Sequence, residues 1–237
     1  MTRKVKKRFT SEVNVIDFNS YMPQKKHRVV LTPRNRNQQE YLLKLQDEKK
    51  SIVFAIGPAG TGKTLLAVQV GIKLFQEGQV DKIIVTRPAV SVDEDLGFLP
   101  GTLNEKMAPW TRPIFDVLSD YYHTKDIAKM LEEGVIEISP LAYMRGRTFK
   151  NAYIVADEMQ NATVNQMKML LTRLGEGSKM VVTGDLAQAD RLNDNGLINF
   201  CDLIENKQLN YLDIVQFDHR DIERHNAVKE VLTVYGD

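Results

Sequence analysis

The chain has 237 residues, 43% of them hydrophobic, and carries 32 Lys and Arg against 31 Asp and Glu. This length supports one sizeable core, and a net charge of +1 gives no argument for nucleic acid, membrane or acidic substrates. No apolar run approaches the ~20 residues of a membrane helix, and no signal-peptide core follows the basic N-terminus. Cys201 is the only cysteine, which excludes an internal disulfide. We therefore expect a cytoplasmic protein with one catalytic domain.

Positive charge is concentrated at the N-terminus. Residues 1–36 hold ten Lys and Arg against two acidic residues, a net charge of +8, which leaves 22 basic and 29 acidic residues elsewhere. Such an arm can neutralise the phosphates of a nucleic acid, with an affinity that falls as salt rises. A solvated tail explains it equally well, because no aromatic residues interleave its basic cluster to stack on bases. We place the only domain boundary near residue 36, with the body at 37–237.

The body begins with a short amphipathic helix at residues 38–48, followed by a continuous apolar run at 51–56 of the kind that a parallel sheet buries on both faces. Helices and β-rich apolar runs alternate from there. We expect strands at 82–86, 135–139, 152–156, 179–183 and 211–217, and helices at 65–76, 103–122, 124–132, 164–174, 196–205 and 221–235. This order predicts a three-layer α/β fold with a mostly parallel central sheet.

A phosphate-binding loop follows the first strand. The segment Gly57-Pro58-Ala59-Gly60-Thr61-Gly62-Lys63-Thr64 matches G-x-x-x-x-G-K-[ST] at every fixed position, between a buried strand and a helix. Its glycines allow successive N–H groups to point at phosphate oxygens, and the helix N-terminus adds a favourable dipole. Lys63 is expected to reach the β- and γ-phosphates, and Thr64 to place its hydroxyl on magnesium. The motif predicts a P-loop NTPase.

Two carboxylates end the strand at 152–156. Asp157 suits a residue that holds magnesium directly or through one of its ligands, and Glu158 suits the residue that orients and deprotonates the attacking water, because ligands sit at the carboxyl edge of such sheets. A nucleotide kinase gains nothing from a residue that activates water, so Glu158 favours an ATPase. The plainer alternative is a pair of first-turn helix charges. A third strand runs into Gly184-Asp185-Leu186-Ala187-Gln188, where Gln188 is a candidate γ-phosphate sensor or simply a turn-exposed glutamine.

Together these residues resemble the PhoH family, whose ATPase core is similar to the RecA-like first motor domain of superfamily 1 helicases. The likeness covers nearly all of residues 36–237. Beyond the phosphate loop, the following segments carry it: Thr86–Val90, Leu96–Gly101, Leu141–Thr148, Asp157–Asn161, Gln166–Met169, Thr183–Asp185 with Gln188, and Arg224-His225. Ala189–Leu192 departs from the family, which more often has a short acidic, proline-containing turn there. The resemblance implies ATP as the nucleotide.

The resemblance also implies contacts around the nucleotide. Asn37-Gln38 is similar to a segment that reads the adenine edge, and amide groups can donate and accept at once; an ordinary helix-start residue is the alternative for Gln38. Thr86-Arg87-Pro88 lies where related motors touch a nucleic-acid backbone, and Arg145 and Arg147 are further candidates. Solvated charges or salt bridges to the acidic body explain these arginines equally well.

A helicase needs a second motor domain to supply an arginine across the nucleotide, and we expect no room for one in a chain of this length. Two solutions follow: an arginine given in trans within a ring, which can contribute ~10³ to 10⁵ in rate, or no motor activity. Arg224, expected in the last helix, is the first candidate, with Arg220 and Arg173 behind it. We therefore expect a homo-oligomer, with a hexamer as one arrangement.

The leading hypothesis is an oligomeric ATPase coupled to nucleic acid, with RNA favoured, that remodels or unwinds its substrate. The alternative is a binding module in which ATP switches an assembly and turnover is incidental. Glu158 and Gln188 favour the enzyme.

Overall fold

The computed structural model of the chain describes residues 27–88, 103–189, 194–205 and 207–235, and the statements below concern these residues. Most of the basic arm lies outside them, as do Ala89–Gly101 and, in the stretch Ala189–Leu192 where the sequence departs from the family, residues 190–192. No helix in the described ranges is long and apolar enough to cross a membrane.

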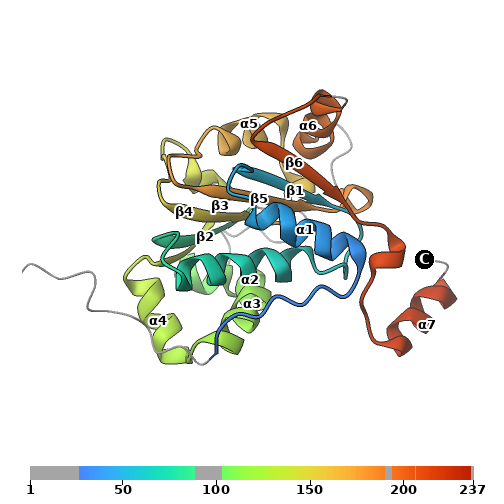
Figure 1. The fold of residues 1–237 in the computed structure, drawn as a ribbon, viewed down its shortest axis with the longest axis horizontal. Coiled ribbons are helices and arrows are strands. Elements are labelled where there is room, and N and C mark those ends of the chain that lie inside the picture. The colour runs from blue at the N-terminus through green and yellow to red at the C-terminus, as the bar shows by residue number, and fades with distance from the viewer. Residues whose placement is uncertain (1–26, 89–102, 190–193, 206, 236–237) are drawn as a thin grey trace, which may run out of the picture.

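A six-stranded sheet forms the centre of the molecule, in the order β3-β2-β4-β5-β1-β6, and every pairing between neighbours is parallel (Figure 1). Parallel neighbours require crossover connections, and the helices between the strands provide them. The predicted α/β, RecA-like P-loop fold is confirmed, with a sheet that is parallel throughout. The strands are β1 (Ile52–Ile56), β2 (Lys82–Arg87), β3 (Ile136–Pro140), β4 (Ala152–Ala156), β5 (Lys179–Gly184) and β6 (Leu212–Gln216).

Helices cover both faces of the sheet, which gives three layers (Figure 1). Val53 and Ala55 of β1 face a core shared with α1, α2, α3 and α4, whereas Phe54 faces a second core with α5 and α6. The central strands β1 and β4 are buried along their whole length because helices pack against each side, which explains their continuous apolar sequence. The helices are α1 (Arg36–Gln46), α2 (Lys63–Gln76), α3 (Leu103–Tyr121), α4 (Thr124–Glu132), α5 (Val164–Leu171), α6 (Gly196–Ile204) and α7 (Asn226–Tyr235).

The last helix starts later than the sequence predicts. We expected it from Asp221, but α7 begins at Asn226, and His219–Asp221 form a separate 3-10 turn, η5. Asp218 caps this turn through its side chain, and the side chain of Asp221 bonds back to the Asp218 backbone, so the two carboxylates stabilise the turn in place of a helix start. Arg224 therefore lies in the extended stretch before α7, not in the helix.

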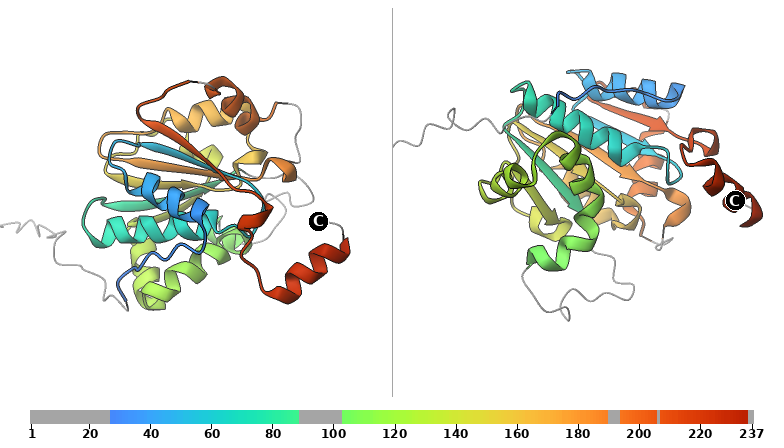
Figure 2. Two further views of the ribbon diagram at one scale, coloured as in Figure 1. Left: turned by 45° about the vertical axis from the view of Figure 1, so that its right-hand side comes forward. Right: turned by 90° about the horizontal axis from the view of Figure 1, so that it is seen from below.

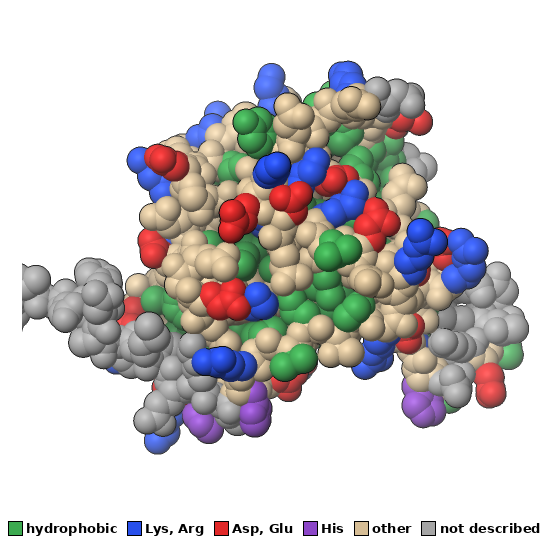
Figure 3. All heavy atoms as spheres, viewed as in Figure 1, with side chains coloured by type: hydrophobic (Ala, Val, Ile, Leu, Met, Phe, Trp, Pro, Cys, Tyr) green, Lys and Arg blue, Asp and Glu red, His purple; other side chains and the backbone are tan. Residues whose placement is uncertain are grey.

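The edges of the body are tied by buried apolar contacts and by ion pairs. Val29 is buried in the core shared with α1 and α2, so packing against the body begins upstream of residue 36, where we expect the domain boundary. Lys44 of α1 lies 2.6 Å from Asp213 on the edge strand β6, and Lys50 lies 3.4 Å from the same carboxylate. On the face shown in Figure 3, Lys and Arg side chains lie among Asp and Glu.

Candidate nucleotide site

The predicted site residues gather at the carboxyl ends of β1, β4 and β5, as expected for ligands of a parallel sheet. They surround a pocket of about 250 Å³. The phosphate loop closes one side, the acidic end of β4 another, and the turn after β5 the third. Its lining comprises Ala59, Gly60, Gly62, Lys63, Thr64, Leu65, Asp157, Glu158, Thr183, Gly184, Asp185 and Gln188. Gly57, Pro58 and Thr61 belong to the loop but lie outside this lining, as do the predicted Gln38 and Arg224.

The loop adopts the conformation that its glycines permit. Gly57 has a φ of 145° and Gly60 a φ of 83°, values that residues with a Cβ rarely take. A Cβ at Gly57 would stand 2.3 Å from the carbonyl oxygen of Phe217, so only glycine fits between the loop and the segment after β6. The hydroxyl of Thr61, fully buried, donates to the carbonyl of Pro58 at 3.0 Å and closes the loop on itself. These contacts fix the backbone that would cradle phosphate.

Lys63 folds back over the loop. Its ammonium donates to the carbonyl of Gly57 at 2.7 Å and to that of Pro58 at 2.8 Å. Burial lowers the pKa of Lys63, against the opposing pull of the nearby carboxylates, Asp185 first among them. Within the part of the chain that the structure describes, no carboxylate forms a salt bridge with this ammonium. A bound phosphate would supply the negative charge that offsets its desolvation.

Thr64 and the end of β4 are joined directly. The Thr64 hydroxyl donates to Oδ1 of Asp157 at 2.7 Å, and the hydroxyl of Thr183 on β5 donates to the same oxygen. Hydroxyl and carboxylate oxygens are the ligands that Mg²⁺ prefers. The oxygens of Thr64 and Asp157 therefore fit a magnesium ion, and the loop glycines and Lys63 fit the phosphates that it would accompany.

Glu158 is held by two neighbours. Its backbone takes a left-handed conformation, with φ 54° and ψ 37°, which is uncommon for a residue with a side chain and is typical of functional positions. Its carboxylate accepts a hydrogen bond of 2.5 Å from the amide of Gln160 and lies 3.7 Å from the guanidinium of Arg87 at the end of β2. Gln160 is almost fully buried and also accepts from the backbone N–H of Asp185 at 3.2 Å, so it links the ends of β4 and β5.

Gln188 and Gln38 lie on different sides of the loop. Gln188 ends the short 3-10 turn Leu186–Gln188, is exposed, and lines the pocket. Gln38 is buried in α1, where its amide donates to the carbonyl of Thr61 at 3.0 Å and its oxygen accepts from the backbone of Arg34 at 2.8 Å. Gln38 thus supports the loop from behind, and the contact to adenine stays a prediction.

The three candidate arginines for nucleotide contact lie in different places. Arg224 lies against Gly60 of its own phosphate loop, where its Nε is 2.5 Å from the position of a Cβ at that glycine. Arg220 pairs with Asp218 at 2.6 Å and has a side chain that is 90% exposed. Arg173 donates to the carbonyls of Met169 and Arg147 near the amino ends of β4 and β5, at the sheet edge opposite the pocket.

Of the arginines considered for nucleic acid, Arg147 has a structural role. It pairs with Glu137 through the two terminal nitrogens of its guanidinium group and lies over the ring of Phe149, 4.7 Å from its centroid. The salt bridge that we kept as an alternative is thus the one that Arg147 forms. Arg145 is exposed, and Arg87 faces Glu158 at the pocket.

Sequence reasoning missed three residues that organise the site. Thr183 was noted only within a family segment, although its hydroxyl also interrupts the apolar sequence of β5 and donates to Asp157. Gln160 was noted only as part of a family segment. Asp221 is buried and accepts a hydrogen bond of 2.7 Å from Asn37. These two residues are 184 positions apart in the chain, so no local sequence pattern predicts the contact.

A parallel sheet with a glycine loop, a lysine and a threonine at its first strand, and an acidic end on a neighbouring strand, defines a P-loop nucleotide-binding protein. The family model described as "PhoH-like protein" matches residues 30–236. The chain belongs to the PhoH family.

Curated relatives agree with this assignment. The chain is 47% identical over 208 residues to a PhoH-like protein of Mycobacterium tuberculosis, covering 87% of this chain and 58% of the relative. A PhoH-like protein of Bacillus subtilis is 44% identical, with 85% and 63% covered, and protein PhoH of Escherichia coli is 43% identical, with 86% and 57% covered. The chain thus matches less than two thirds of each relative's length. Among solved structures, the Sulfolobus solfataricus SWI2/SNF2 ATPase core in complex with dsDNA aligns at 17% identity over 69% of this chain and 34% of that chain, with a TM-score of 0.41, on which we rest no argument.

Proposed function

We propose that the chain hydrolyses ATP with magnesium. The observation that carries this proposal is the hydrogen bond between the phosphate-loop hydroxyl of Thr64 and the carboxylate of Asp157, because it brings the loop and the acidic end of β4 into one pocket. Glu158 is the next residue along the chain and lines the same pocket. A site for phosphates and a carboxylate suited to activating water are therefore adjacent.

Each residue has a role that follows from its chemistry. Lys63 and the loop N–H groups bind the phosphates, and Thr64 with Asp157 holds the metal. Magnesium, when bound, offsets phosphate charge at this position. Glu158 accepts a proton from the attacking water and orients it, an effect worth about 10² to 10⁴ in rate for a general base. Gln188, at the pocket rim, is suited to hydrogen-bond both the water and the γ-phosphate.

Coupling to nucleic acid is the second part of the proposal, with RNA as the first substrate to test. The contact between Arg87 and Glu158, 3.7 Å apart, favours it. A phosphodiester near the end of β2 would compete for the guanidinium of Arg87, because arginine binds phosphate through its planar fork. Glu158 would then lose one partner and be freer to act on water, so nucleic acid would stimulate hydrolysis.

Self-association is the third part, with a hexameric ring as one arrangement. Three apolar side chains of α7 support it: Val228, Val231 and Val234 are 36%, 51% and 84% exposed and follow one another at helical spacing. An exposed stripe of this kind is typical of a helix that packs against another molecule.

The alternative function is a nucleotide-dependent binding switch with little turnover. The hydrogen bond from Gln160 and the pairing with Arg87 favour it, because both hold Glu158 in place. Lys63→Ala should abolish nucleotide binding under either function. Glu158→Gln should bind ATP and fail to cleave it only if Glu158 activates water. Equal loss of binding in both variants would contradict these roles.

The deciding experiment measures magnesium-dependent ATP hydrolysis over a range of protein concentrations, with and without single-stranded RNA or DNA, and the mass of the assembly in parallel. Activity per subunit that rises with assembly and is stimulated by one nucleic acid supports the proposal. ATP binding with negligible, unstimulated turnover supports the switch.

A further inference from the structure

The segment Phe217–Arg224, which we term the C-terminal strap, connects β6 to α7 and passes over the phosphate loop. At its start, the backbone N–H of Phe217 donates to the carbonyl of Ile56 at 2.7 Å. Near its end, the backbone N–H of Glu223 donates to the carbonyl of Gly60 at 3.0 Å. The strap is thus hydrogen-bonded to the residue before the loop and to its middle.

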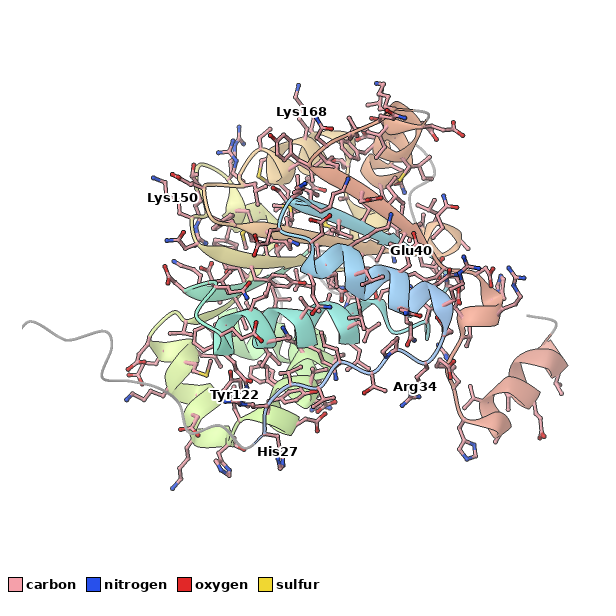
Figure 4. The ribbon with its side chains drawn as sticks, viewed as in Figure 1. His27, Arg34, Glu40, Tyr122, Lys150 and Lys168 are labelled. Atoms are coloured by element: carbon pink, nitrogen blue, oxygen red, sulfur yellow. The ribbon has the colours of Figure 1, made fainter. Side chains whose placement is uncertain are left out.

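Asp221 anchors the strap to the start of α1. Asp221 is 6% exposed. Its carboxylate accepts from the amide of Asn37 at 2.7 Å and from the backbone of Asp218 at 2.9 Å, while its carbonyl accepts from the amide of Asn35 at 3.3 Å. A buried carboxylate that accepts these hydrogen bonds fixes the position of the strap, because a displacement would leave its negative charge without hydrogen-bond donors. In Figure 4, Arg34 marks the beginning of α1 beside the strap.

The positively charged side chain of Arg224 lies over the phosphate loop, three residues after Asp221. Its Nε, Cγ and Cδ lie 2.5, 3.2 and 3.3 Å from the position of a Cβ at Gly60, so the side chain crosses the loop backbone. Among the described residues, the guanidinium of Arg224 has no hydrogen-bond or ion-pair partner, whereas the neighbouring Arg220 is paired with Asp218. The positive charge of Arg224 lies beside the N–H groups of the phosphate loop. It therefore adds to the positive electrostatic potential that a bound phosphate would experience there.

We propose that Arg224 binds the polyphosphate of the nucleotide held by the loop of its own chain, and that Asp221 is the positioning residue that holds it there. The inference rests on the proposed function and names a further nucleotide-binding residue in it. It replaces the expected role of Arg224 in trans, because the strap's hydrogen bonds to the loop lie within one chain and an arginine given to a neighbour would have to leave Gly60.

The position of the strap also has a consequence for α7. This helix begins two residues after Arg224, at Asn226, and stands apart from the sheet and its covering helices (Figure 2). The strap is hydrogen-bonded to the phosphate loop and is joined through the chain to α7, so nucleotide bound by Arg224 would restrain the base of that helix.

The first test measures affinity for ATP with magnesium in the Glu158→Gln background, where turnover is blocked. Arg224→Ala should weaken binding about 10- to 100-fold, the range expected when a hydrogen bond to a charged group is lost. Arg224→Lys should recover part of this loss because it keeps the charge. His219→Ala, an exposed change on the same strap, is the matched control and should stay within about twofold of its parent. Arg224→Ala binding as tightly as this control would overturn the proposal.

The second test distinguishes an Arg224 that binds nucleotide in its own chain (cis) from one that binds nucleotide in a neighbouring subunit (trans). Arg224→Ala is mixed with Lys63→Ala at equal concentrations, and hydrolysis is compared with the sum of the two separate samples. In cis, no subunit of the mixture has both residues, so activity stays at that sum. Restored activity would mean that the Lys63→Ala subunit supplies its arginine to a neighbour, which would overturn the cis assignment while leaving the ATPase proposal intact.

The third test addresses Asp221. If it acts through Arg224, the Asp221→Asn and Arg224→Ala double variant should bind ATP no more weakly than Arg224→Ala alone. Fully additive losses would mean that Asp221 does not position Arg224. Thermal unfolding of each variant shows whether the fold is retained, and the milder Asp221→Asn is chosen because it keeps the side-chain shape.

Discussion

Replacing Gly57 with alanine tests whether the strap and the phosphate loop form one packed unit. The new Cβ would stand 2.3 Å from the carbonyl oxygen and 2.8 Å from the carbonyl carbon of Phe217, both backbone atoms that cannot rotate away. Backbone strain at a φ of 145° costs about 1 to 3 kcal/mol. Displacing Phe217 also weakens its hydrogen bond to Ile56, worth about 1 kcal/mol, and its edge-to-face contact with Tyr41, worth about 0.5 to 1.5 kcal/mol.

These contributions predict a loss of about 3 to 5 kcal/mol in the free energy of unfolding, or about 6 to 20 °C in Tm for a chain of this size. Gly134→Ala is the matched control, because Gly134 has a φ of 71° with no atom within 4 Å of a new Cβ. It should cost only the left-handed penalty of about 1 to 2 kcal/mol. Urea unfolding followed by circular dichroism measures both. If the free energy of unfolding of Gly57→Ala is no more than about 1 kcal/mol below that of Gly134→Ala, the strap and the loop are not packed as tightly as we infer.

Three further predictions concern other contacts. Arg87→Gln should raise ATP turnover without nucleic acid and reduce its stimulation, because Glu158 loses one partner; steady-state assays check this, and unchanged basal turnover would argue against the contact. The hydrogen bond from Arg147 lowers the pKa of Glu137, so this pair should stabilise the fold above the ordinary carboxyl pKa and lose that effect as pH falls through the lowered one. Urea unfolding should therefore show a larger loss between about pH 5 and pH 3 for the wild type than for Glu137→Gln. Burial lowers the pKa of Lys179 to about 8 while it donates to two carbonyls at the end of α1, so Lys179→Met should cost about 1 to 3 kcal/mol in urea unfolding by leaving them unpaired.

The sequence predicts the sheet well because each central strand must be apolar on both faces. The predicted strand at 152–156 coincides with β4, and the one at 51–56 differs from β1 by one residue. The phosphate loop is equally predictable from the sequence, because its residue spacing and its place between a strand and a helix are both local features. Such elements are fixed by short-range chemistry, so a pattern of neighbouring residues identifies them.

The strap is where local reasoning fails. The residues from Asp221 onward have a helical pattern, but Asp221 is held by Asn37, which lies 184 residues earlier in the chain. This contact keeps the segment in a short turn and delays the helix to Asn226, which places Arg224 over Gly60. A pattern within a window of residues carries no information on such a pairing, so the position of the arginine follows only from the three-dimensional structure.

The contacts within the pocket bear on how fast the site turns over. Lys63 bonds to loop carbonyls, Thr64 bonds to Asp157, and Glu158 bonds to Gln160 and pairs with Arg87. In the proposed function, ATP with magnesium would exchange the first two sets of contacts for its own, and these exchanges would offset part of the binding energy. The contacts of Glu158 involve no loop atom, so nucleotide binding alone leaves them in place. Under the proposed function, activation of water would therefore be a separate step from ATP binding, and a partner that binds Arg87 at the end of β2 would control it.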